Sequence, residues 1–412
     1  MKPADFVVIG AGVLGVNVAT ELKRRHPDAG VVLLEKEAEP GLHASGRNSG
    51  VLHAGFYYTA DSLKARFTRQ GNRRMQEYCT SKGLRIHRCG KLVLARDESE
   101  LEGLAELLRR ANRNGVVLEE LDEAAALRIE PRARVFRKAL YSPSTATVDA
   151  PEVMRSMVAD AQALGVELRL GVRYLSGRPG AVQTSSGTID CGYVVNTAGL
   201  YADRVARDFG FSERYRILPF KGLYLYSSEP AGAFRTNIYP VPNLKNPFLG
   251  VHVTVTVDGH AKLGPTAIPC LWREQYGWRD NFHLSELTEA VGMSAGLFLR
   301  AGFDFRGLAL EEMRKYHRPN LVAQAATLAT GVNAADYVRW GKPGIRAQLV
   351  DTATRTLVQD FCVEGDGRSF HVLNAVSPGW TCSIPFAEYT CDEIQRRLGI
   401  VAEAEKSTGW SR

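Results

Sequence analysis

The sequence predicts an α/β protein in which a Rossmann-like domain is interleaved with a second, α+β domain that contains a mainly antiparallel sheet. A strand–helix–strand pattern opens the chain. Strand and helix patterns recur in the middle and at the end, which indicates that the first domain is discontinuous. A stretch of alternating apolar and polar residues lies between them and is typical of antiparallel strands.

The N-terminal unit begins with the apolar run 6–9, which is typical of a buried parallel strand. A glycine turn follows, and apolar residues at helical spacing then predict a helix that ends near Pro27. Residues 31–34 form a second apolar run, closed by Glu35 and Lys36. Together these segments predict one βαβ unit.

The rest of the chain divides into helical and strand patterns. Helices are expected over 62–81, 98–112, 122–129, 151–164 and 383–398, with a mainly helical stretch over 285–328. Strands are expected over 91–94, 166–170, 193–195 and 370–374, and an antiparallel sheet over 215–263. The predicted Rossmann-like domain therefore comprises 1–85, 146–212 and 341–405, the second domain comprises 86–145 and 213–340, and 406–412 form a tail.

Composition limits the function classes. The chain has 52 Lys and Arg against 45 Asp and Glu, a net charge of +7, which we interpret as a solvated surface; attraction to anionic substrates or an anionic membrane face is the alternative. No basic run is interleaved with aromatic residues, so no nucleic acid is expected. Seven cysteines without a CxxC pair fit a reduced cytoplasmic protein with no metal site. No apolar run is long enough to predict a transmembrane helix.

The turn of Gly10, Gly12 and Gly15 predicts a dinucleotide site. The glycines permit a tight turn, close approach of a pyrophosphate, and close packing of helix on strand. Glu35 follows the second strand, where a carboxylate accepts hydrogen bonds from ribose hydroxyls. FAD is favoured over NAD because the adjoining loop over 42–55 is long enough to follow the cofactor, and because Ala198 and Gly199 end a turn that resembles the second FAD-side turn of two-dinucleotide flavoproteins.

Motifs along nearly the whole chain resemble the L-2-hydroxyglutarate dehydrogenase/oxidase family of the D-amino-acid-oxidase-like flavoproteins. The most specific is the loop over 43–58 together with 62–66, which reads HASGRNSGVLHAGFYY and SLKAR. The others are 219–222, 238–242, 248–252, 263–265, 344–348 and 374–378. The resemblance implies one FAD, a two-domain fold and oxidation of an (S)-2-hydroxy acid, L-2-hydroxyglutarate or a related dicarboxylate, to the 2-oxo acid.

The resemblance also implies where FAD binds. Ser45, Asn48 and Ser49 would line the flavin or its phosphates, and Val172 would lie near the adenine. Residues Gly379, Thr381 and Ser383 would lie over the pyrimidine end of the flavin. Lys36, next to Glu35, is a further candidate to bind the cofactor. The chain departs from the family at Arg47, where His is usual, at 59–61, at Lys221, where Arg is common, and at Val376 and 379–382, and it matches poorly over 300–340. These departures leave the substrate open.

Oxidation of a 2-hydroxy acid by flavin needs a base for the hydroxyl proton and a cation for the carboxylate. His53 is the first candidate for the base and His252 the second. Arg346 is the candidate for the carboxylate clamp, because its planar fork matches a carboxylate. Lys221 could neutralise a second carboxylate or assist the reaction with oxygen, and Tyr57 and Tyr239 could donate to substrate oxygens, although surface and core roles compete with these.

Three alternatives stay open. One is an amine or amino-acid oxidase of the same fold, and another is a tailoring oxidase that acts on a larger hydroxy acid. The third is a binding module without turnover. Oxygen or a quinone is expected as the electron acceptor, with a carrier protein also open. The location is expected to be cytoplasmic, with peripheral contact to the inner membrane as an option. Oligomeric state and covalent attachment of FAD are not predicted.

Overall fold

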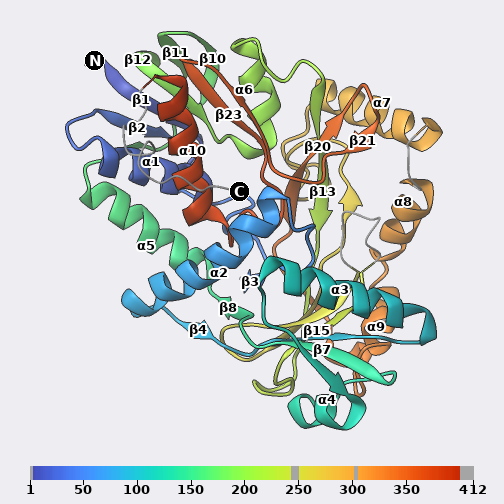
Figure 1. The fold of residues 1–412 in the computed structure, drawn as a ribbon. Coiled ribbons are helices and arrows are strands. Elements are labelled where there is room, and N and C mark those ends of the chain that lie inside the picture. The colour runs from blue at the N-terminus through green and yellow to red at the C-terminus, as the bar shows by residue number, and fades with distance from the viewer. Residues whose placement is uncertain (1–2, 243–249, 301–304, 400–412) are drawn as a thin grey trace, which may run out of the picture.

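The computed structural model describes residues 3–242, 250–300 and 305–399. Part of the motif predicted over 248–252 and the C-terminal tail over 406–412 lie outside these described residues. The predicted fold class is confirmed: helices and parallel strands alternate in one part of the molecule, and antiparallel sheets form the other (Figure 1). Among the described helices, none has the length and apolar character needed to cross a membrane.

The first sheet is built around the N-terminal βαβ unit. Strand β1 (Ala4–Ile9) pairs in parallel with β2 (Val31–Leu34) and with β12 (Gly187–Asn196). β9 (Glu167–Arg169) extends the sheet beyond β2, and β23 (Ser369–Asn374) pairs with β12. Helices α1 (Val13–Arg25), α5 (Ala150–Ala163) and α10 (Ser383–Arg397) pack together against this sheet around one apolar core. Burial on both faces explains the uninterrupted apolar runs of the parallel strands.

One part of this sheet was not predicted. Strands β10 (Tyr174–Arg178) and β11 (Ala181–Thr184) form an antiparallel hairpin that continues onto β12. The side chains of β10 are largely exposed, so the strand lacks the apolar alternation that marks a half-buried strand. β22 (Cys362–Gly365) adds a further antiparallel strand to β23.

The second large sheet unites distant segments. Its order is β19-β14-β17-β16-β15-β5-β7-β6. The strands are β5 (Lys91–Leu94), β6 (Glu119–Asp122), β7 (Lys138–Ser142), β14 (Leu225–Tyr226), β15 (Asn237–Pro240), β16 (His252–Val255), β17 (Ala261–Gly264) and β19 (Arg339–Trp340). A parallel pairing of β5 with β15 joins the part before residue 145 to the part after 213. Helices α3 (Leu101–Asn114), α4 (Glu123–Ile129) and α9 (Arg318–Ala326) cover it.

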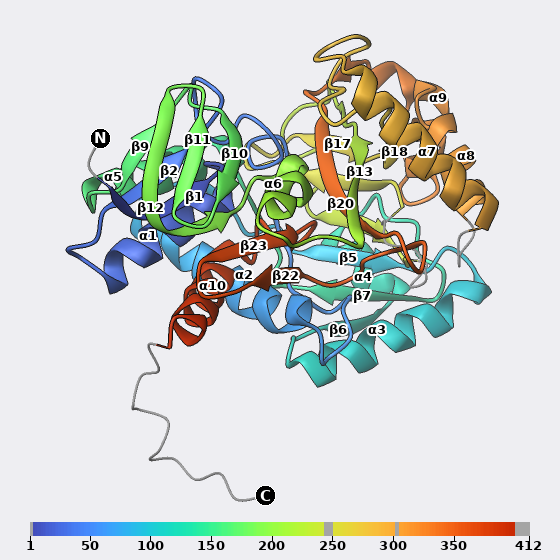
Figure 2. The same cartoon turned by 90° about the horizontal axis from the view of Figure 1, so that it is seen from above.

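A smaller sheet stands between these two. β13 (Tyr215–Gly222) pairs along its whole length with β20 (Gly344–Asp351), and β18 (Ile268–Pro269) and β21 (Thr356–Leu357) flank them. Helices α7 (Leu284–Arg300) and α8 (Phe305–Arg314) cover its outer side, and α6 (Ala202–Asp208) lies between it and the first sheet (Figure 2). We call the paired strands β13 and β20 the β13–β20 ribbon. We propose that this ribbon is the junction of the two predicted domains, since its pairing crosses the predicted boundary at 341.

The remaining elements complete the junction. A three-stranded sheet of β3 (Val51–Leu52), β8 (Ala146–Val148) and β4 (Ile86–His87) lies next to α2 (Leu63–Ser81). α2 begins where predicted, because Ser62 caps it by accepting a hydrogen bond from the Ala65 N–H. These elements bring the specific loop over 43–58 between the sheets.

Candidate active site

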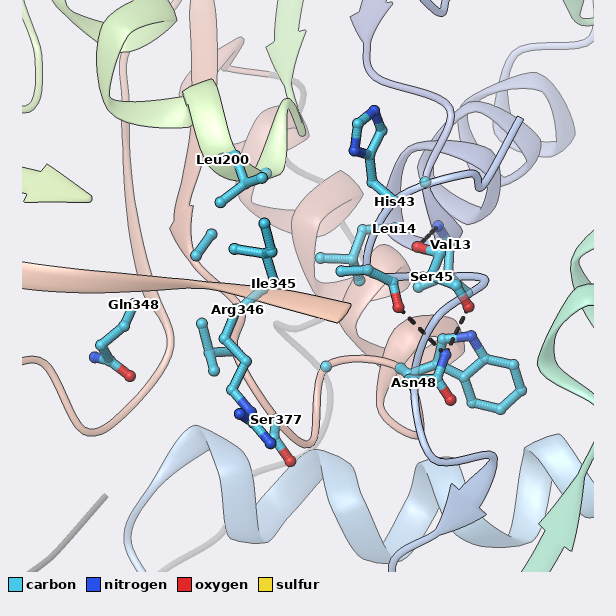
Figure 3. Close-up of a pocket in the computed structure, with 18 of the residues that line it drawn as sticks. Val13, Leu14, His43, Ser45, Asn48, Leu200, Ile345, Arg346, Gln348 and Ser377 are labelled. Carbon is cyan, nitrogen blue, oxygen red and sulfur yellow. Dashed lines mark hydrogen bonds between the residues drawn. The ribbon is translucent and has the colours of Figure 1, made fainter. Parts of the chain in front are cut away.

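A cavity of about 920 Å³ lies where the three sheets meet. Its wall runs from the glycine turn at one end to the strands β15, β16 and β20 at the other. Most predicted site residues contribute to it: Gly10, Gly12, Glu35, Lys36, Ser45, Asn48, Ser49, His53, Tyr57, Val172, Ala198, Gly199, Tyr239, His252, Arg346, Gly379 and Thr381. Gly15, Lys221 and Ser383 are not part of the wall. Figure 3 shows part of this wall, with Ser45 between Val13 and Asn48.

The glycine turn tolerates no side chain at two of its positions. Gly10 adopts a φ of +100°, and a Cβ there would lie 2.8 Å from the carbonyl oxygen of Thr197. A Cβ on Gly15 would lie 1.9 Å from the carbonyl oxygen of Gly10, so Gly15 acts by packing α1 on β1 although it does not line the cavity. α1 has no acidic residue in its first turn, so the partial positive charge of its N-terminus suits a phosphate.

Glu35 is held in place at the other side of this turn. Its carboxylate accepts hydrogen bonds from the backbone N–H groups of Ala11, at 3.0 Å, and Glu37, at 3.0 Å. The carboxylate is buried at the cavity wall, where its remaining lone pairs suit ribose hydroxyls. A glycine turn, the N–H groups of a helix N-terminus and a fixed carboxylate acceptor in one wall are the combination that a dinucleotide such as FAD requires.

The loop over 43–58 is pinned by its own polar side chains. The Ser45 hydroxyl accepts from the Val13 N–H at 2.9 Å, and the Asn48 amide donates to the Ser45 carbonyl at 2.6 Å. The Gly50 N–H donates to Asn48 Oδ1 at 2.8 Å, and the Val51 N–H to Ser49 Oγ at 3.2 Å. The specific loop is therefore an ordered wall between the glycine turn and His53.

Arg47, the departure from the family in this loop, has a structural role of its own. Its Nε donates to the Leu42 carbonyl at 2.6 Å, and its guanidinium lies 4.1 Å from the ring centroid of Tyr276. The Tyr276 hydroxyl contacts His43 Nδ1 at 2.6 Å, and Lys36 pairs with Glu274 at 2.7 Å. These contacts form a clasp, which we define as Lys36, His43 and Arg47 held by Glu274 and Tyr276.

Two histidines meet at the substrate end. The His53 backbone N–H donates to Thr381 Oγ1 at 3.3 Å, so His53 lies beside the segment that follows β23. His252 stacks on the Tyr239 ring with centroids 3.7 Å apart, and its Nδ1 lies 2.9 Å from the Gly250 carbonyl. Burial, with the positive charge of Lys91 nearby, sets the pKa of His53 well below its usual 6.5, and burial lowers the pKa of His252 to about 3. Both rings are therefore neutral at neutral pH and able to accept a proton.

Arg346 enters the cavity from β20 (Figure 3). One Nη donates to the Thr266 carbonyl at 2.8 Å, which orients the guanidinium. Burial lowers its pKa, yet an arginine stays charged, so this cation lies in a site of low polarity where an anionic substrate group binds strongly. Lys221 differs from the expectation: it pairs with Ile345 in the β13–β20 register, one residue from Arg346, so its side chain points to the other face of the sheet.

Two lysines near the site escaped the sequence analysis. Lys64 lines the cavity near Asp360, and burial lowers its pKa to about 8. Lys91 lies behind the wall, and burial lowers its pKa to about 7. Lys64 belongs to the specific motif over 62–66, so the motif itself was its signal. The signal of Lys91 was weaker, a single lysine at the start of an otherwise apolar strand.

The fold and the cavity together define an FAD-dependent oxidoreductase. Residues 5–393 match the family described as FAD dependent oxidoreductase. The chain is 33% identical over 400 residues to an L-2-hydroxyglutarate dehydrogenase of Escherichia coli, covering 96% of this chain and 94% of that protein. It is 34% identical over 420 residues to the mitochondrial L-2-hydroxyglutarate dehydrogenase of Homo sapiens, covering 96% and 89%. The chain belongs to the L-2-hydroxyglutarate dehydrogenase family, as its motifs predicted.

A solved structure supports the fold independently. The L-alpha-glycerophosphate oxidase of Mycoplasma pneumoniae, with FAD bound, superposes with a TM-score of 0.76 at 19% identity, covering 96% of this chain and 95% of that one. At this identity the likeness establishes the fold alone. The predicted cofactor FAD is confirmed by the family and by the cavity that fits it.

Proposed function

We propose that this enzyme oxidises L-2-hydroxyglutarate to 2-oxoglutarate with FAD. The observation that carries the proposal is the meeting of two neutral histidines and a buried arginine in the cavity that also contains the glycine turn. The names of the curated relatives support the choice of substrate. FAD, when bound, supplies the hydride acceptor at its N5 atom.

Arg346 holds the carboxylate next to the hydroxyl-bearing carbon. Its bond to the Thr266 carbonyl orients the guanidinium at the cavity wall, where its planar fork matches a carboxylate. Fixing this carboxylate orients the C–H bond that breaks toward the hydride acceptor.

His53 takes the hydroxyl proton in this proposal. Its Nδ1 is buried and has no hydrogen-bond partner among the described residues, and the residue lies beside Thr381 at the predicted flavin face. The Nδ1 of His252 is already bonded to the Gly250 carbonyl, and its ring is stacked on Tyr239, so we assign it the role of fixing the substrate side of the site. One proton goes to the histidine and one hydride to the cofactor, which accounts for both hydrogens removed.

Turnover with defined substrates tests the proposal. Purified enzyme, L-2-hydroxyglutarate and an artificial two-electron acceptor should give one 2-oxoglutarate per acceptor reduced. L-Glutamate should give no ammonia. Ammonia release from amino acids, without turnover of hydroxy acids, would favour the amino-acid oxidase. Turnover only of a bulkier hydroxy acid would favour a tailoring oxidase, and a protein that stays colourless with added FAD would favour a binding module.

The electron acceptor and the location are also proposals. Oxygen and a quinone remain the candidates, and we place the protein in the cytoplasm with loose contact to the inner membrane as an option that its net charge of +7 allows. The rates at which oxygen and a soluble quinone reoxidise the reduced enzyme separate the two acceptors. Release from membranes by salt would identify an electrostatic contact.

A further inference from the structure

A fully buried lysine lies behind the substrate end of the cavity. The side chain of Lys91, on β5, is 0% exposed, and its Nζ lies 4.9, 4.7 and 4.6 Å from the ring centroids of Phe56, Tyr57 and Tyr239. Nζ has no hydrogen-bond partner among the described residues. A lysine is almost never fully buried without a partner, because an isolated ammonium is costly to remove from water.

The surroundings of Lys91 contain no compensating anion. The titratable groups that face it are Cys89 on its own segment, His53 and Tyr57 on the loop after β3, Tyr239 on β15 and His252 on β16. No carboxylate of a described residue contributes to its pKa. Aromatic faces attract a cation but supply no negative charge. The positive charge of Lys91 therefore lacks a counter-charge within the described fold.

The same wall has unsatisfied groups on the cavity side. Tyr57 and Tyr239 line the cavity, and the Tyr57 hydroxyl, like His53 Nδ1, is buried without a hydrogen-bond partner in the described residues. The lysine and these groups thus form one polar wall around two tyrosine rings.

We propose that Lys91 is the positioning residue for the second carboxylate of the substrate. It acts through the rings of Tyr57 and Tyr239, which separate it from the cavity, and supplies the positive charge for the carboxylate distal to Arg346. The inference rests on the proposed function, because only a dicarboxylate needs a cation at each end. A monocarboxylate would bind with Arg346 alone.

Proton uptake is a readout that a purely structural lysine would not give. Since burial lowers the pKa of Lys91 to about 7, it is mostly neutral at about pH 8 in the free enzyme. A dianion bound in the cavity, on the other side of the two rings, favours the charged form of Lys91, so binding takes up a proton from solvent. At about pH 6 the lysine is already charged and the uptake disappears.

Calorimetry of the oxidised holoenzyme in buffers of different ionisation enthalpy tests this, with glutarate as dicarboxylate and pentanoate as its matched monocarboxylate. We expect uptake of up to one proton per glutarate at about pH 8 and little at about pH 6. Lys91→Met should abolish the uptake and weaken glutarate binding roughly 30-fold or more, with little change for pentanoate. Lys91→Arg should restore the preference for glutarate without proton uptake, because arginine stays charged.

Matched variants complete the test. Lys138→Met removes an exposed lysine of the adjacent strand β7, and should leave binding of both ligands unchanged. The inference is overturned if Lys91→Met takes up the same number of protons as the wild type, weakens both ligands equally, or if Lys64→Met alone removes the preference for glutarate. Because uptake by the wild type needs no variant, a failure of Lys91→Met to fold leaves the test intact.

The failure of this inference can be told from that of the proposed function. If L-2-hydroxyglutarate does not reduce the flavin of the wild-type enzyme, the proposed function fails. If it does reduce the flavin and glutarate binds without proton uptake at about pH 8, only the role of Lys91 fails.

Discussion

The two histidines of the site carry pKa values below the usual 6.5 because both are buried beside positive charge. A base with a lowered pKa stays unprotonated as the pH falls, so its activity extends to more acid conditions. We predict that the rate of flavin reduction at saturating substrate stays level as the pH falls from about 8 through the usual histidine pKa of 6.5. An acid limb centred near the ordinary histidine pKa, lost in His53→Ala, would contradict this environment.

Separate variants of the two histidines distinguish base from support. His53→Ala should lower the rate of flavin reduction roughly 10²–10⁴-fold, the usual contribution of a general base. His252→Asn should mainly raise KM, because it removes the ring stacked on Tyr239. The reverse pattern in rapid-reaction kinetics would assign the base to His252.

Arg346 is the proposed carboxylate clamp, and its burial strengthens the binding of an anionic group. Arg346→Met should lower kcat/KM for L-2-hydroxyglutarate by roughly 30-fold or more, since a buried charge pair is lost. Arg346→Lys should recover only part of this, because an ammonium lacks the planar fork. Arg178→Met on the exposed face of β10 is the control and should leave steady-state kinetics unchanged. Equal effects of Arg178→Met and Arg346→Met would argue against a specific clamp.

The sequence predicted which residues lie at the cavity, but it predicted less well which way their side chains point and which groups surround them. Arg346 and both histidines were found because motifs carried them into the wall. Lys221 faces away, since a one-residue step in a strand reverses the side chain, and that register depends on the pairing of β13 with the unpredicted β20. Lys91 became visible only when Phe56, Tyr57 and Tyr239 were brought around it by the fold.

The packing of helix α1 on strand β1 at the N-terminus can be tested at Gly15. A Cβ on Gly15 would lie 1.9 Å from the Gly10 carbonyl oxygen, so Gly15→Ala should push α1 from β1 and lower both FAD content and thermal stability. Gly292→Ala in α7 is the control: nothing lies within 4 Å of its Cβ, and alanine favours a helix by up to about 1 kcal/mol. Full FAD occupancy in purified Gly15→Ala would contradict the packing argument.

The clasp joins two elements over the cofactor end of the cavity. Tyr276→Phe removes the 2.6 Å contact with His43 and keeps the ring under Arg47. We expect FAD to dissociate roughly 2- to 10-fold faster, the effect of one hydrogen bond. Flavin fluorescence after dilution measures the rate. An unchanged rate would show that the clasp orders the loop over 43–58 without retaining FAD.

Elements were predictable where their signal was local. The apolar run of β1, the glycines of the turn and the Ser62 cap of α2 each determine structure within a few residues. The hairpin of β10 and β11 was missed although its pairing is local, because the largely exposed side chains of β10 lack an apolar alternation. The strand β20 was missed because its position depends on β13, more than 100 residues earlier in the chain. Pairing across such distances leaves little trace in a single sequence.

At the scale of the whole molecule, the discontinuous arrangement creates the site. The first sheet supplies the cofactor end, the second sheet supplies His252 and Tyr239, and the ribbon of β13 and β20 supplies Arg346. Segments with a strand–helix pattern alternate along the chain with segments typical of antiparallel strands. This alternation predicted two interleaved domains, and the predicted fold class was confirmed. The sequence did not predict that the pairing of β13 with β20 crosses the expected boundary at 341. The residue pattern of a strand does not show which sheet the strand joins.

Anaerobic reduction of the bound flavin tests the central claim most directly. Mixing the purified enzyme with L-2-hydroxyglutarate in the absence of oxygen should bleach the flavin absorbance, and the D-enantiomer should not, because Arg346 and His53 fix one face of the reacting carbon. Full bleaching by L-2-hydroxyglutarate with formation of one 2-oxoglutarate per FAD is the predicted result. An unbleached flavin with L-2-hydroxyglutarate, or equal bleaching by both enantiomers, would contradict it.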